Sequence, residues 1–177
     1  MATTTGLIAD NIRYLEQALT LLRDIDDVTL TYVDPPRFAS GVGAHLRHNL
    51  DHFRSFLDGL DTRRIDYDAR ERDVRIEING EYAAEKIGET IARLQAIASL
   101  PADTPLQVKM DCGEDAKQWC RSTVARELEF LVSHTVHHYA LVAMILRLQG
   151  LEPGAEFGVA PSTLRFQHQL SCALQAG

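Results

Sequence analysis

The feature that most constrains the fold of this chain is the stretch of residues 123–150. Its apolar residues recur at helical spacing, and it contains neither proline nor glycine before Gly150. This pattern predicts one long helix that ends at the glycine. Within it, His134 and His138 are four residues apart, so they lie about 40° apart on one helix face. Two imidazoles in this arrangement can reach the same metal ion.

A second group of histidines lies far upstream, in residues 40–60, where the apolar pattern is again helical. His45, His48 and His52 follow one another at intervals of three and four residues, so they share one stripe of that helix. A transition metal needs about three donors that converge at about 2 Å, and facing helices can supply them. Histidine pairs on helices are also commonly solvated or packed in a core. Only the convergence of the two groups would make a metal site.

The composition bounds the class of protein. A chain of 177 residues with 45% hydrophobic content predicts a single domain, spanning residues 1–177, with a continuous core. The net charge of −7 argues against partners such as nucleic acid or an anionic membrane. We find neither a signal-peptide pattern nor an apolar run long enough for a membrane span. The three cysteines, Cys112, Cys120 and Cys172, lack CxxC spacing, which predicts reduced thiols in a cytoplasmic protein.

The remaining pattern predicts an all-α fold of four main helices with one small β insertion. Pro35 and Pro36 separate the first two helices. Alternating residues on either side of a turn predict a β-hairpin between the third and fourth helices. Ser162 could cap a short helix near the end of the chain. The predicted helices are residues 5–27, 40–60, 82–100 and 123–150, and the predicted strands are residues 106–110 and 119–124.

The segment 62–80 is charged and rich in turn-forming residues. Because its charges are mixed, we interpret it first as a solvated, ion-paired excursion from the helices. A second interpretation stays open. Arg70 and Arg72 could fold back towards the histidines and contact an anionic substrate, since a guanidinium matches a carboxylate in shape and charge.

The His-Leu-Arg-His segment that ends at His48, followed by His-x-x-x-His at His134 and His138, resembles the DinB-like family of metal-dependent enzymes. The resemblance extends from the first helix to about residue 150. It implies an up-down-down-up four-helix bundle with one divalent metal held by three histidines. The ligands that it implies are His48, His134 and His138. His45 or His52 could replace His48, because all three share a stripe.

Other groups would support such a site. A ligating imidazole normally donates its second N–H to an oxygen, and the helix positions of Asp51 and Glu127 make them candidates for this role. His137 points about 100° away from His138, so we interpret it as a surface residue or an outer partner. Three neutral imidazoles suit zinc, nickel or iron(II) and leave positions open on the ion.

The resemblance implies that the ion activates a low-molecular-weight thiol, and a bound water molecule is the other candidate nucleophile. The leading hypothesis is therefore a metal-dependent thiol transferase or hydrolase acting on a small-molecule substrate. One alternative is a metal-sensing or metal-stabilised bundle without catalysis. Another is a helical interaction protein whose histidines bind nothing. Bundles of this size can pair through an apolar helix face, so a homodimer is also compatible with the sequence.

Overall fold

The computed structural model describes residues 4–111, 113 and 118–175. Within these residues the chain forms seven helices and a three-stranded sheet, so it is mostly helical, with a small β part. The predicted all-α class therefore holds for most of the chain. The helices are α1 (Thr5–Asp24), α2 (Asp27–Thr31), α3 (Val42–Gly59), α4 (Arg75–Ile78), α5 (Gly80–Ala96), α6 (Val124–Leu148) and α7 (Pro161–Gln175), and the strands are β1 (Arg64–Asp66), β2 (Pro105–Lys109) and β3 (Cys120–Thr123).

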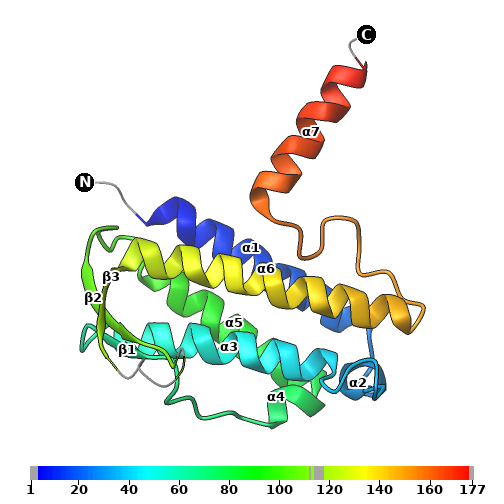
Figure 1. Ribbon diagram of the computed structural model, residues 1–177, viewed down its shortest axis with the longest axis horizontal. Coiled ribbons are helices and arrows are strands. Elements are labelled where there is room, and N and C mark those ends of the chain that lie inside the picture. The colour runs from blue at the N-terminus through cyan, green and yellow to red at the C-terminus, as the bar shows by residue number, and fades with distance from the viewer. Residues whose placement is uncertain (1–3, 112, 114–117, 176–177) are drawn as a thin grey trace.

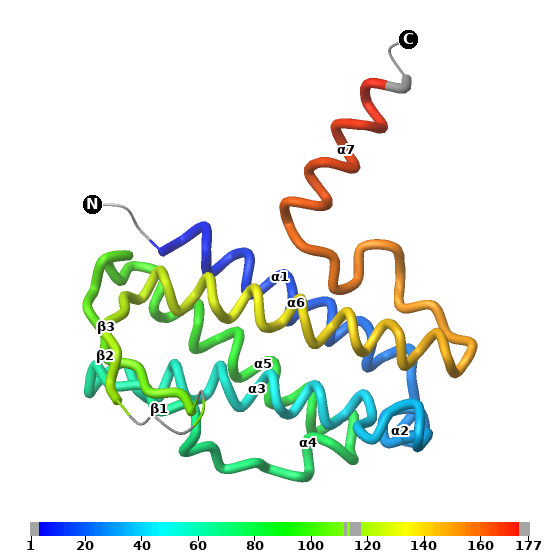
Figure 2. Tube along the Cα trace, viewed as in Figure 1, coloured from blue at the N-terminus to red at the C-terminus, as the bar shows by residue number. Residues whose placement is uncertain are grey.

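The four long helices α1, α3, α5 and α6 lie side by side (Figure 1). Helix α1 packs against α5 and α6, and α3 packs against the same two helices. Their apolar faces form one buried cluster, because residues at intervals of three and four point inward along each helix. The tube in Figure 2 shows that α3 and α6, distant in the sequence, run next to each other. This contact brings the two histidine segments together.

Helix α6 begins and ends at well-defined caps. The side chain of Thr123 accepts a hydrogen bond from the backbone N–H of Arg126, which satisfies one free donor of the first turn. At the other end, Gly150 has a φ of 80°. The N–H of Gly150 bonds to the carbonyl of Arg147, and that of Leu151 bonds to the carbonyl of Leu146. This is a Schellman motif, and it confirms the predicted glycine stop.

The predicted hairpin is present. Strand β2 pairs antiparallel with β3, with Leu106 opposite Ser122. The sequence prediction missed β1, which pairs parallel with β2 on its other edge. The segment 62–80 is therefore more than a solvated excursion. Its apolar residues Ile65, Tyr67 and Ile76 are buried, and α4 packs against α3. A short strand between charged residues carries too few apolar positions to be recognised by periodicity.

Helix α7 extends away from the other helices (Figure 1). It starts at Pro161, one residue before the expected cap at Ser162, and proline is well suited to the first helical position. Among the helices of the described residues, we find none with both the length and the apolar character that a bilayer crossing requires.

Candidate metal centre

Five imidazoles meet where α3 packs against α6. His45, His48 and His52 come from α3, and His134 and His138 come from α6. The ring centroids of His52 and His134 are 4.1 Å apart, and those of His48 and His134 are 5.1 Å apart. The ring of His138 lies 4.6 Å from that of His48 and 4.5 Å from that of His134. The two histidine groups of the sequence therefore form one cluster.

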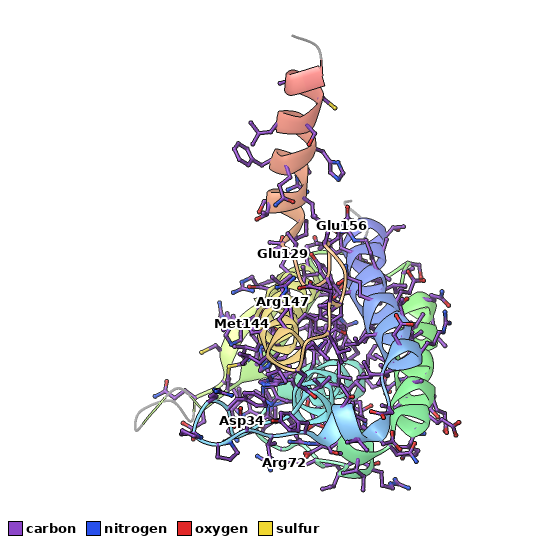
Figure 3. The ribbon with its side chains drawn as sticks, turned by 90° about the vertical axis from the view of Figure 1, so that its right-hand side faces the viewer. Asp34, Arg72, Glu129, Met144, Arg147 and Glu156 are labelled. Atoms are coloured by element: carbon purple, nitrogen blue, oxygen red, sulfur yellow. The ribbon has the colours of Figure 1, made fainter. Side chains whose placement is uncertain are left out.

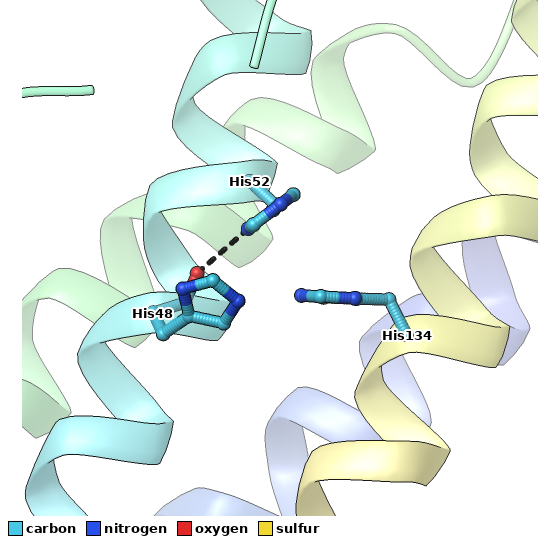
Figure 4. Close-up of side chains that lie close together, drawn as sticks. All are labelled: His48, His52 and His134. Atoms are coloured by element: carbon cyan, nitrogen blue, oxygen red, sulfur yellow. Dashed lines mark hydrogen bonds between the residues drawn. The ribbon is translucent and has the colours of Figure 1, made fainter. Parts of the chain in front are cut away.

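Three of these histidines form a group that could hold a metal ion. His48, His52 and His134 each offer a ring nitrogen, and these three nitrogens lie within 4.8 Å of one another. Figure 4 shows the rings of His48 and His52 directed from α3 towards the ring of His134 on α6. Such spacing is compatible with ligation after small side-chain adjustments, because zinc–nitrogen bonds of about 2.0–2.1 Å separate ligand atoms by no more than about twice that length.

The group of three close nitrogens therefore contains His52, whereas the ligand set implied by the resemblance contains His138. That set contained His48, His134 and His138, with His45 or His52 as alternatives to His48 on the same stripe. The structure brings all four rings together, so the choice of the third ligand stays a prediction. His45 lies farther out, where its Nδ1 is 3.0 Å from Nδ1 of His138. His137 is exposed, and its ring is 5.0 Å from that of His138.

The hydrogen bonding of His52 fixes its tautomer. Its Nδ1 lies 2.9 Å from the carbonyl oxygen of His48, and a carbonyl oxygen can only accept, so Nδ1 carries the hydrogen. In the neutral ring, Nε2 then keeps its lone pair. A hydrogen bond from one ring nitrogen to a backbone carbonyl is the usual outer contact of a metal-ligating histidine.

His134 has an unsatisfied nitrogen. Its Nε2 is buried and has no hydrogen-bond partner among the described residues. Buried polar atoms nearly always have a hydrogen-bond partner, and each exception calls for a physical explanation. A nitrogen that is reserved for a metal ion explains it, because the neighbouring rings of His48 and His52 offer further donors beside it.

The cluster is uncharged at neutral pH. Burial, followed by the repulsion of neighbouring histidines, lowers the pKa of His134 to about 2 and that of His138 to about 3. Burial also lowers the pKa of His48 to about 4, with further contributions from His52 and Arg70. The pKa of His52 is likewise about 4, mainly because of burial. Neutral imidazoles are the form that binds metals, so no proton has to leave before ligation.

Of the two predicted supporting carboxylates, Asp51 lies in an ion pair. Its buried carboxylate is 2.7 Å from Nη1 of Arg47, and Arg47 also pairs with Glu77. Burial raises the pKa of Asp51, while Arg47 opposes that change. Arg47 thus links Asp51, on the same helix α3, to Glu77 on the short helix α4.

Glu127 is the other predicted carboxylate, and it is also buried. It accepts hydrogen bonds from the hydroxyl of Tyr67, at 2.8 Å, and from the hydroxyl of Ser122. The ring of Tyr67 is stacked on His52, with centroids 5.3 Å apart. Glu127 therefore supports the cluster through an intervening tyrosine. The sequence prediction missed Tyr67, although its alternation with Ile65 in a charged stretch was a weak signal of burial.

The two candidate arginines have different positions. Arg70 reaches the cluster, with its Nη1 3.1 Å from Nε2 of His52 and 3.5 Å from Nδ1 of His48. Arg72 is exposed at the surface (Figure 3). Arg70 also lines an open cavity of about 390 Å³, together with charged and polar side chains that include Asp51, Arg54 and Asp66. Small molecules therefore have room beside the cluster.

Comparison with known proteins does not assign a family. No protein-family model matches the chain. FK506-binding protein 5 of Rhizopus delemar is 31% identical over 103 residues, which are 57% of this chain and 27% of that protein. The chain thus spans about a quarter of the length of this curated relative. The DinB-like resemblance rests on the histidine pattern and remains a prediction.

Proposed function

We propose that this chain is a DinB-like metal-dependent enzyme, in which α1, α3, α5 and α6 correspond to the up-down-down-up bundle of that family. The single observation that carries the proposal is the convergence of His48, His52 and His134 within 4.8 Å at the contact of two helices. The neutral state of the rings and the unsatisfied Nε2 of His134 support it. The curated relative adds no substrate, because the match covers a small part of it.

His48 and His134 belong both to the ligand set implied by the resemblance and to the three nitrogens that converge in the structure. We therefore propose both as ligands, and the third ligand would be His52 or His138. The ligand chemistry suits zinc, nickel or iron(II). A bound divalent ion supplies Lewis acidity, which lowers the pKa of a thiol or of water at an open position. The chain's own residues hold the ligand rings in place: the carbonyl of His48 orients His52, and Glu127 fixes the Tyr67 ring beside it.

The alternative is a metal-binding bundle without catalysis. One observation favours it: the rings of His48, His52, His134 and His138 all lie around one point of the helix contact. Four imidazoles could close the coordination of a tetrahedral ion, as in structural sites, whereas a catalytic site keeps one position open. A closed site would serve sensing or stability.

The test combines metal analysis with an activity assay. We expect about one equivalent of metal per chain in the purified protein, and loss of that metal in His48→Ala and His134→Ala. The variant His168→Ala is the matched control, because His168 is exposed on α7. Parallel measurements on His52→Ala and His138→Ala identify the third ligand.

Catalysis is then measured as consumption of a low-molecular-weight thiol with an electrophilic acceptor, and as hydrolysis of activated esters and amides. Activity that disappears on chelation and returns with metal supports the enzyme. Stoichiometric metal together with inactivity in all these assays supports the non-catalytic alternative. Wild-type protein that binds no zinc, nickel or iron rejects both.

A further inference from the structure

Arg70 places a positive charge directly against the histidine cluster. Its Nη1 is 3.1 Å from Nε2 and 3.3 Å from Nδ1 of His52. Because these two distances are nearly equal, Nη1 lies over the face of the ring, and the in-plane lone pair of Nε2 stays available. The same atom is 3.5 Å from Nδ1 of His48. A guanidinium does not lose its proton in a protein, so the charge persists.

No carboxylate of the described residues forms an ion pair with Arg70, although Asp51 and Asp68 attract its charge at longer range. The contrast is Arg47, which pairs with Asp51 and Glu77. Arg70 takes part in none of the ion pairs among the described residues. Its Nε atom is buried and has no hydrogen-bond partner among these residues. Guanidinium groups that are removed from water normally form paired hydrogen bonds to a carboxylate or a phosphate. Arg70 therefore has donors to offer to an anion from outside the described chain.

We propose that Arg70 binds the carboxylate of a small-molecule ligand beside the metal centre, and that the metal and the carboxylate bind cooperatively. The inference rests on the proposed function, because it requires a cation held by the histidines. A divalent ion at His48 and His52 is repelled by the guanidinium that contacts both rings. A carboxylate on Arg70 neutralises this repulsion, so each ligand raises the affinity for the other.

The space around Arg70 is compatible with such a ligand. The cavity of about 390 Å³ that Arg70 lines is also lined by two further arginines and four carboxylates, namely Arg54, Arg64, Asp51, Asp58, Asp66 and Glu71. The cavity is open to solvent, so a carboxylate-bearing molecule could reach Arg70 through it. The mixed charges of the lining favour a ligand with polar groups in addition to its carboxylate.

The test is the zinc affinity of four forms of the protein, measured by competition with a chromogenic chelator. The forms are wild type, Arg70→Gln, Arg70→Lys and the control Arg72→Gln, whose parent residue is exposed two positions away. Each is measured in chloride and in formate at the same ionic strength. Formate is the probe for a carboxylate, and the constant ionic strength removes differences in screening.

In chloride, we expect Arg70→Gln to bind zinc about fivefold more tightly than wild type, at the low end of coupling between neighbouring sites. Arg72→Gln should stay within about twofold of wild type, because an exposed charge is screened. Arg70→Lys should resemble wild type because it keeps the positive charge, and it provides the comparison if the glutamine variant does not fold. Formate should tighten zinc binding by wild type by about fivefold and leave Arg70→Gln unchanged.

Two results would overturn the proposal while leaving the metal site intact. One is an Arg70→Gln variant that binds zinc no more tightly than Arg72→Gln. The other is formate that changes the zinc affinity of wild type and Arg70→Gln equally. If the wild type binds no zinc, the four forms are compared in the same way with nickel or iron(II). If it binds none of the three metals, the proposed metal site is rejected, and the role of Arg70 is rejected with it.

Discussion

Two buried polar sites lie on α6, about two helical turns apart, and they differ in how well they are satisfied. At Glu127, the hydroxyls of Tyr67 and Ser122 each donate to the carboxylate. At His134, Nε2 has no partner within the described residues. Both positions belong to the same helix and are shielded from water, so burial alone does not explain the difference.

The comparison indicates that the two sites serve different purposes. An unpaired buried polar group costs about 1–3 kcal/mol, which a purely structural site avoids by pairing its atoms, as Glu127 does. In the histidine cluster one buried nitrogen stays unpaired, so this free-energy cost remains. Several neutral imidazoles also lie close together there. Stability is not improved by such an arrangement unless a further partner binds. A metal ion is the partner that this donor set fits best.

The largest effect is expected when one of the proposed metal ligands, His134, is removed. We expect His134→Ala to lower the affinity for zinc by more than about 100-fold, since even outer contacts of a metal contribute about 10- to 100-fold. Its free energy of unfolding without metal should change by less than about 1 kcal/mol, because the lost imidazole carried an unsatisfied atom. Chelator competition and urea denaturation measure the two effects. Zinc affinity equal to that of the His168→Ala control would contradict the ligand role of His134.

The second prediction concerns the satisfied site, where the expected effects are reversed. Glu127→Ala removes the acceptor of two hydroxyls, so the free energy of unfolding should fall by about 2–3 kcal/mol. The zinc affinity should fall by at most about tenfold, since Glu127 reaches the cluster only through Tyr67. Glu129→Ala is the matched control, because Glu129 is exposed on the same helix (Figure 3). If urea denaturation shows a loss in the free energy of unfolding no larger for Glu127→Ala than for this control, the structural role of Glu127 is contradicted.

The smallest expected effect is the pH dependence of stability without metal. The pKa of both His48 and His52 is about 4 in the folded chain, against about 6.5 in an unfolded chain. Between these values the unfolded state binds more protons, so stability falls as the pH decreases from about 6.5 to about 4. Each ring contributes less than about 1.4 kcal/mol per pH unit, and solvent screening reduces this further.

Urea denaturation between about pH 7 and pH 5 measures this slope. His52→Gln should flatten it, because one proton fewer is taken up on unfolding. The control His168→Gln should leave it unchanged, since His168 is exposed. A slope in the His52→Gln variant identical to that of wild type would show that His52 is protonated equally in both states.

Much of the local structure follows from the sequence, because helical periodicity and turn chemistry act over a few residues. The bounds of α6, its glycine stop at Gly150 and the β2–β3 hairpin were predictable for this reason. The spacing of His134 and His138 likewise placed both rings on one face without reference to the rest of the chain. The resemblance then suggested that the α3 histidines face them, and the structure brings His48 and His134 together.

Only the tertiary structure decided which further groups join this pair. His45, His48 and His52 share one stripe of α3, and the way in which α6 crosses that stripe determines that His52 lies nearest to His134. Tyr67 and Arg70 reach the cluster because β1 pairs with β2, a contact between residues far apart in the chain. Local patterns carry no information on such distant contacts, whose geometry depends on how the whole core packs.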